Sequence, residues 1–137
     1  MVNILDMKDI RYINLFSKIT QINTRYCFLY NDAIIFAVPK QFISKAIGED
    51  GRNVKEINRI TRKKIKIIPT PLGIHHAKDF IRAVVSPITF NDMQITDNEI
   101  ILTGGQNKAS LLGRNKRRFM ELQVIVKDFF KKDLRIV

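Results

Sequence analysis

The sequence predicts an α+β fold in which one structural unit occurs twice, and three observations support this prediction. The order helix, strand, strand, helix, helix, strand can be followed in each half of the 137-residue chain. A segment with two prolines and a glycine, PTPLG at 69–73, separates the halves and is the clearest domain boundary. A glycine loop lies at the same place in both halves when the chain is offset by 65 residues, which argues for an internal duplication.

Apolar periodicity and turn residues define the elements of the first half. Isoleucine and phenylalanine side chains spaced three residues apart predict a helix over residues 8–22. The pair Asn31-Asp32 predicts a hairpin turn between two strands rich in aromatic and β-branched residues. The remaining expected elements are a short helix over 40–47 that ends at Gly48, a helix that begins near Arg52, and an alternating strand over 64–69.

The second half is predicted to follow the same order. Its expected elements are a helix over 76–85, strands over 88–96 and 99–105 around an Asp97-Asn98 turn, a short helix over 107–112, a longer helix over 114–130 and a strand over 134–137. The 65-residue offset aligns Ile47–Val54 with Leu112–Phe119, so the glycine loop follows the short helix in both copies.

The charge of the chain indicates a polyanionic partner. Lysine and arginine number 24 against 13 acids, which gives a formal net charge of +11 and favours nucleic acid first and an anionic membrane second. No stretch approaches the roughly 18 apolar residues of a membrane span, and the N-terminus lacks a secretory pattern. The lone Cys27 excludes an intramolecular disulfide and a multi-cysteine metal site. We therefore expect a soluble cytoplasmic protein without a membrane partner.

The first glycine loop, Gly48-Glu49-Asp50-Gly51, has a physical use beside a helix N-terminus. Glycines permit backbone angles that a Cβ would forbid, and the loop then presents unpaired amides where the helix dipole favours a phosphate. The carboxylates of Glu49 and Asp50 should weaken such binding without abolishing it, because backbone donors remain whatever the side chains are.

The second loop departs from this pattern in the opposite way. It keeps Gly113 but has Lys116 where the last glycine should stand, so we expect a compromised geometry together with an added cation. We expect neither loop to bind strongly by itself, which favours joint use.

Cations accumulate beyond both loops. Arg52, Lys55, Arg59 and Arg62 recur at three- and four-residue steps, which places them along one helical face. Arg114, Lys116, Arg117 and Arg118, with Asn115 among them, crowd the start of the second long helix. The helix dipole disfavours cations there, and a bound phosphate would resolve that conflict. Such contacts add affinity without sequence choice and make binding steeply salt-dependent.

The element order, with a Gly-x-x-Gly loop between the two later helices, resembles a K homology (KH) domain of type II. That family clamps about four nucleotides of single-stranded RNA or DNA with this loop. Two such domains in tandem, residues 1–71 and 72–137, resemble the RNA-binding part of NusA-type transcription termination and antitermination factors, in the short form of the archaeal members. The resemblance implies three-stranded sheets packed by helices on one face, and single-stranded RNA, as a nascent transcript, for a partner, with RNA polymerase as a second.

The resemblance also implies the site. The candidate RNA-binding residues are Ile47, Gly48, Glu49, Asp50, Gly51, Arg52, Val54, Lys55 and Arg59 in the first copy, and Gly113, Arg114, Asn115, Lys116, Arg117 and Arg118 in the second. Ile47 and Val54, with Leu112 and Phe119 in the repeat, are candidates for the apolar floor under the bases. Ordinary core packing explains these four residues equally well.

No enzyme is predicted. The adjacent His75 and His76 face different ways on a helix and have no cysteine or carboxylate cluster beside them. The segment 104–110 lacks the ending and glycine spacing of a phosphate-binding loop and fits a turn at a strand end. Cys27 lies mid-strand among aromatic residues, which favours a buried, inert thiol. No cofactor or metal is expected.

Two alternatives remain open at the level of sequence. The chain could be a protein-interaction module with vestigial RNA clefts that docks on RNA polymerase or a ribosomal partner, and the acidic first loop and the missing glycine of the second favour this hypothesis. It could also be a KH protein of ribosome assembly or RNA decay.

Overall fold

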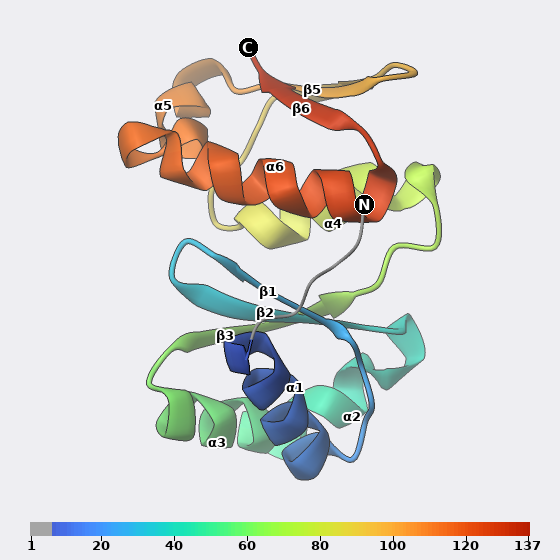
Figure 1. Cartoon of the computed structure of the whole chain (residues 1–137), viewed down its shortest axis with the longest axis vertical. Helices are drawn as coiled ribbons and strands as arrows, with labels where there is room; N and C mark the ends of the chain where they lie inside the picture. Colours follow the sequence, from blue (N-terminus) through green and yellow to red (C-terminus); the bar gives the residue numbers. More distant parts are fainter. Residues whose placement is uncertain (1–6) are drawn as a thin grey trace. The chain divides into compact units, whose positions relative to one another are not determined.

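A computed structural model describes residues 7–137, with side chains from residue 10 onward (Figure 1). The first six residues of the predicted 1–71 domain lie outside the described residues. The chain divides into two compact units on either side of the bond between Thr70 and Pro71. We call residues 7–70 the first unit and residues 71–137 the second unit, and each is described by itself. No helix within 7–137 is both long enough and apolar enough to cross a membrane.

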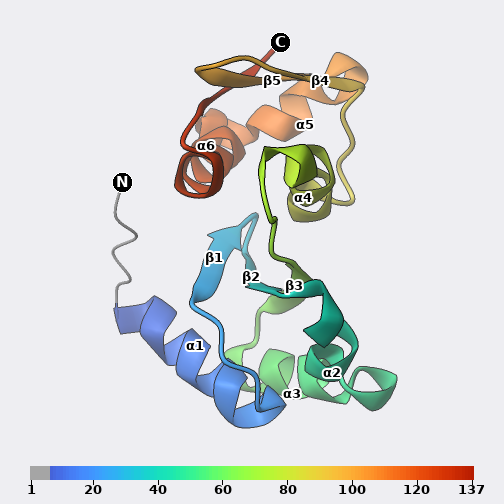
Figure 2. The ribbon, with the colours of Figure 1, turned by 90° about the vertical axis from the view of Figure 1, so that its right-hand side faces the viewer.

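The first unit is a three-stranded sheet with three helices on one of its faces (Figure 2). Its elements are α1 (Met7–Thr20), β1 (Tyr26–Tyr30), β2 (Ala33–Val38), α2 (Ile43–Ile47), α3 (Arg52–Thr61) and β3 (Lys64–Pro69). The central strand β2 pairs antiparallel with β1 and parallel with β3, with Phe36 opposite Cys27 on one side and Ile67 on the other. The predicted hairpin is confirmed, because Asn31 (φ 51°) and Asp32 (φ 62°) are the two left-handed residues of its turn.

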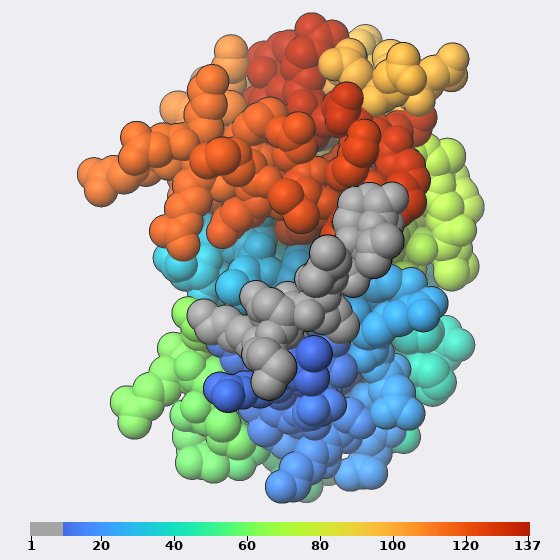
Figure 3. Space-filling view, in the orientation of Figure 1, coloured from blue at the N-terminus to red at the C-terminus, as the bar shows by residue number. Residues whose placement is uncertain are grey.

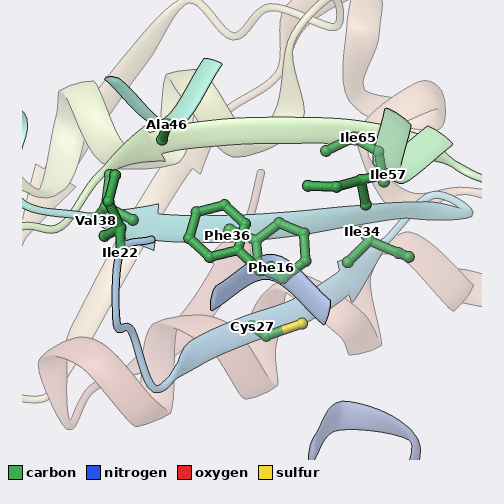
Figure 4. Close-up of a cluster of buried hydrophobic side chains, with 9 residues drawn as sticks. All are labelled: Phe16, Ile22, Cys27, Ile34, Phe36, Val38, Ala46, Ile57 and Ile65. Carbon is green, nitrogen blue, oxygen red and sulfur yellow. The ribbon is translucent and has the colours of Figure 1, made fainter. Parts of the chain in front are cut away.

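The core of the first unit lies between this sheet and its helices (Figure 4). The rings of Phe16 on α1 and Phe36 on β2 stack with centroids 4.4 Å apart, and both side chains are fully buried. Cys27 is a buried cysteine in the same cluster, as predicted. Ala46 of α2 and Ile57 of α3 complete the cluster from the helix side, so the helices that flank the glycine loop are anchored in the core.

The second unit repeats this topology. Its elements are α4 (Ala77–Val85), β4 (Asp92–Ile95), β5 (Glu99–Thr103), α5 (Lys108–Leu112), α6 (Arg117–Phe130) and β6 (Asp133–Ile136). Strand β5 is central, antiparallel to β4 and parallel to β6, and the three helices again lie on one face of the sheet (Figure 2). The strand predicted over 88–96 is wrong in length, because only residues 92–95 pair with β5 as β4.

The two long helices end alike but differ in length. Helix α3 has 10 residues and α6 has 14. Each stops at a left-handed cation, Arg62 (φ 59°, ψ 27°) and Lys131 (φ 58°, ψ 36°), and in each unit the next strand begins two residues later. The whole is an α+β architecture of small three-stranded sheets and helices that is compatible with KH-like folds.

Candidate functional site

The two glycines of the first loop occupy different regions of backbone angles. Gly48 ends α2 with φ 82° and ψ 165°, a region that only glycine occupies readily. Asp50 (φ 56°, ψ 27°) and Gly51 (φ 73°, ψ 20°) follow in the left-handed helical region, and α3 starts at Arg52. Asp and Asn tolerate the left-handed region better than most residues, which gives Asp50 a role in the backbone as well as a charge.

The second loop has the same backbone. Gly113 has φ 76° and ψ 173°, Asn115 has φ 55° and ψ 29°, and Lys116 has φ 59° and ψ 26°. The expectation that Lys116 compromises the geometry is therefore wrong. A lysine can adopt the left-handed conformation at a cost of about 1–2 kcal/mol, and no atom obstructs a side chain at the corresponding Gly51, where an added Cβ would meet nothing nearer than the Cε of Lys55 at 3.8 Å.

Matching side-chain bonds brace both loops. Asn53 Nδ2 donates to the carbonyl of Lys45 at 3.2 Å, and Arg118 Nε donates to the carbonyl of Ser110 at 2.7 Å. The donors are 65 residues apart, as are the acceptors, so the long helix is tied to the short helix in the same way twice. Arg118, predicted to contact the ligand, thus has its Nε engaged inside the protein. The role of Asn53 was missed, and its alignment with Arg118 at the 65-residue offset was the available signal.

The tips of the loops hold backbone donors that have no acceptor within the described residues. Within residues 7–137, the amides of Glu49 and Asp50, and of Arg114 and Asn115 in the second loop, donate no hydrogen bond to the protein. All four residues are exposed. Neither α3 nor α6 has a side-chain cap or an acid in its first turn. Both helix N-termini therefore keep the partial positive charge that suits an anion.

The side chains around the two loops differ in charge. In the first loop Arg52 lies 3.8 Å from Glu49, and both side chains are largely exposed (75% and 82%), so this ion pair contributes little to stability. In the second loop Arg114 and Lys116 are exposed and lie beside no acid in the loop. Figure 3 shows long side chains of the orange segment around α5 and the start of α6 extending away from the body of the second unit.

The predicted basic face of α3 exists, but Arg59, like Arg52, is paired with an acid. Arg59 binds Glu56 through two bonds, Nε to Oε1 at 3.0 Å and a second nitrogen to Oε2 at 2.8 Å. The hydrogen bond from Arg59 lowers the pKa of Glu56, and the same bond raises the pKa of Arg59. Lys55 and Arg62 are exposed on this helix and its end, so they are the better candidates for a phosphate.

The middle of the corresponding face of α6 is apolar, between Arg117 and Lys127. Met120 and Val124 stand where the offset places Lys55 and Arg59, and they are 54% and 61% exposed. The cations of the second unit therefore gather at its loop, whereas those of the first unit gather along its helix.

The candidate groove residues Ile47, Val54, Leu112 and Phe119 are half-buried. Val54 packs against the core of the first unit. Partial burial leaves each of them with some exposed apolar surface beside a loop, as both the packing interpretation and the base-contact interpretation require.

The histidines and glycines considered above for enzyme chemistry take part in local contacts and turns of the fold. His76 Nδ1 accepts the amide of Leu72 at 3.0 Å, and its ring lies 4.1 Å from that of His75. Gly104 and Gly105 form a turn that joins β5 to α5. Among residues 7–137, no group of three or more His, Cys, Asp or Glu side chains is placed to hold a metal ion.

Two curated proteins of similar sequence carry the same name. The chain is 33% identical over 91 residues to the probable transcription termination protein NusA of Methanococcus vannielii, which covers 66% of this chain and 51% of that protein. It is 30% identical over 91 residues to the protein of the same name from Methanocaldococcus jannaschii, covering 66% of this chain and 48% of that one. The chain thus matches about half the length of these curated relatives. The similarities support a NusA-related family without singling out a member.

The fold has a counterpart among solved structures. A crystal structure titled APE1850 superposes with a TM-score of 0.67 over 97% of this chain and 100% of that chain, at 16% sequence identity. At this identity the likeness concerns the fold alone. No protein-family model matches the chain.

Proposed function

We propose that this protein is a NusA-like factor that binds single-stranded RNA through two type II KH domains, residues 1–71 and 72–137, and acts in transcription termination or antitermination. The names of the two archaeal relatives and the RNA recognition mode of KH domains support this proposal. The proposed partners are a nascent transcript and RNA polymerase, in the cytoplasm, with no membrane and no cofactor.

One observation carries the proposal. Two loops with closely similar backbone angles precede two long helices, and each holds, on two exposed residues, amides that donate no hydrogen bond to the described part of the protein. Backbone geometry that persists while the side chains change from Glu49-Asp50 to Arg114-Asn115 is the expected outcome if the amides bind the ligand. A phosphate at each loop would accept from these amides, and Lys55, Arg62, Arg114 and Lys116 would neutralise neighbouring phosphates.

A salt titration tests RNA binding. The affinity of the intact protein for a labelled single-stranded RNA of about 12 nucleotides, three times the span of one loop, is measured between about 50 and 200 mM KCl. We expect log K to fall with log salt by about 0.7 for each phosphate contacted, and therefore a slope steeper than about −2. Duplex RNA of the same length is the control, because its bases are not available to a KH groove.

A protein-interaction module is the second candidate, favoured by the exposed Met120 and Val124 on α6 and by the acidic first loop. It predicts weak RNA binding with a flat salt dependence. A purified transcription reaction with and without the protein then tests the role in transcription: a change in readthrough at a terminator supports the proposed function, and readthrough that stays the same while RNA binds speaks against it.

A further inference from the structure

The two loops are a matched pair that differs in charge. Residues 48–52 hold two acids and one arginine, for a net charge of −1, whereas residues 113–117 hold three cations and no acid, for a net charge of +3. The backbones are alike, since Gly51 and Lys116 differ by only 14° in φ (73° and 59°) and 6° in ψ (20° and 26°). Any difference in their affinity for phosphate must therefore come from the side chains.

The charge difference is large enough to change the affinity of each loop for a phosphate. Two unit charges about 4 Å apart in water interact by roughly 1 kcal/mol, which is about fivefold in affinity. A phosphate at the first loop meets the carboxylates of Glu49 and Asp50, and Arg52 is shared with Glu49 at 3.8 Å. A phosphate at the second loop meets Arg114 and Lys116, whose charges no acid of that loop offsets.

The charge difference between the two long helices is opposite to that between the two loops. Lys55 and Arg62 give the first unit exposed cations along and at the end of α3. In the second unit Met120 stands at the position of Lys55. The 65-residue offset places Lys127 at the position of Arg62, and Lys127 is bound to Asp133 at 3.3 Å, while Lys131 ends α6 as Arg62 ends α3. The middle of this helical face is thus basic in the first unit and apolar in the second.

We infer that the two units bind one RNA strand unequally: the loop at 113–117 supplies most of the phosphate affinity, and the first unit contributes through the α3 cations more than through its loop. This inference rests on the proposed function. It differs from the expectation that neither loop binds strongly by itself, which depended on the acidic first loop and on a distorted second loop.

Exchanging the loops tests the inference, because the two loops have nearly the same backbone angles. The first variant gives the second unit the acidic loop (Arg114→Glu, Asn115→Asp, Lys116→Gly). The reciprocal variant gives the first unit the basic loop (Glu49→Arg, Asp50→Asn, Gly51→Lys). A charge-matched control changes the net charge by the same −4 as the first variant at two exposed positions of α1 (Arg11→Glu, Lys18→Glu). Circular dichroism verifies that each variant folds.

The same 12-nucleotide RNA and salt series provide the readout. The acidic second loop is expected to weaken binding by about 25-fold or more, from two lost cations at about fivefold each, and to flatten the salt slope by about 1.4. The reciprocal variant is expected to tighten binding, Lys55→Met to weaken it by about fivefold, and the α1 control to change it by less than about fivefold.

Two results would overturn the inference, and they are distinguishable. If the acidic second loop leaves the affinity of a salt-dependent complex within about threefold of wild type, well below the effect of one lost charge, the inference fails and the proposed RNA binding stands. If the wild-type protein shows no salt-dependent RNA binding at all, the proposed function fails and the inference fails with it.

Discussion

Replacing Gly48 with alanine should destabilise the first unit far more than replacing Gly51. At Gly48 (φ 82°, ψ 165°) an added Cβ would lie 3.0 Å from both the backbone nitrogen and the Cγ of Asn53. The backbone angles alone cost about 1–3 kcal/mol for a residue other than glycine. Moving the side chain of Asn53 away would break its bond to Lys45, a further loss of about 1 kcal/mol.

The net loss follows from these contributions. Alanine recovers about 0.4–1 kcal/mol by restricting the unfolded chain, so the free energy of unfolding should fall by about 2–3 kcal/mol. Gly51→Ala is the matched control, because its Cβ would meet only the Cε of Lys55 at 3.8 Å. Its left-handed strain of about 1–2 kcal/mol is partly offset in the same way, which leaves a loss of about 1 kcal/mol.

Tyrosine fluorescence is the suitable assay. The chain has no tryptophan and three tyrosines, Tyr12, Tyr26 and Tyr30, all in the first unit, so the signal reports unfolding of that unit alone. Urea titrations of both variants and wild type give the free energies. Equal losses for Gly48→Ala and Gly51→Ala would refute the claim that the two glycines meet different backbone demands.

Three further perturbations probe the first unit with the same signal. Asn53→Ala removes the bond to the α2 carbonyl and should cost about 1 kcal/mol; no loss would mean that the bond does not hold the loop. Phe16→Ala removes a fully buried ring stacked on Phe36 and should cost about 3–5 kcal/mol, unless the core collapses around it. Glu56→Gln should lower stability at neutral pH and approach wild type in acid. The pKa of Glu56 in the folded protein lies below its usual 4.5. The stabilisation by ionised Glu56 is therefore present above pH 4.5 and is lost as the pH falls through the folded pKa. A difference that does not shrink as the pH falls from about 7 to about 3 would contradict this.

Much of the fold could be predicted because its signals are local. The three-residue apolar spacing of α1, the Asn31-Asp32 turn and the glycine that ends α2 each act over a few residues, and the elements formed there. Strand β4 was overestimated for the same reason: the run over 88–96 is rich in β-forming residues, but a partner strand decides where pairing starts, and no local pattern reports that.

The site was less predictable because its details depend on tertiary contacts. Glycine spacing located both loops, yet it also suggested that Lys116 would distort the second, since a missing glycine does not reveal whether space remains for a side chain. The engagement of Arg118 with Ser110 depends on how α5 and α6 pack together. The pairing of Arg59 with Glu56 lies within one helix, and the three-residue spacing offered that signal.

The unequal lengths of α3 and α6 indicate how such a unit can grow. Four additional residues lengthen a helix by about 6 Å and rotate its end by about 400°, which is only about 40° from a whole turn. The strand that follows α6 therefore leaves in nearly the original direction and still pairs in parallel with the central strand. Insertions of one or two residues would swing that exit by about 100–200° and aim the strand away from its sheet. In this architecture, a long helix can be extended by nearly full turns while the following strand keeps its pairing with the central strand.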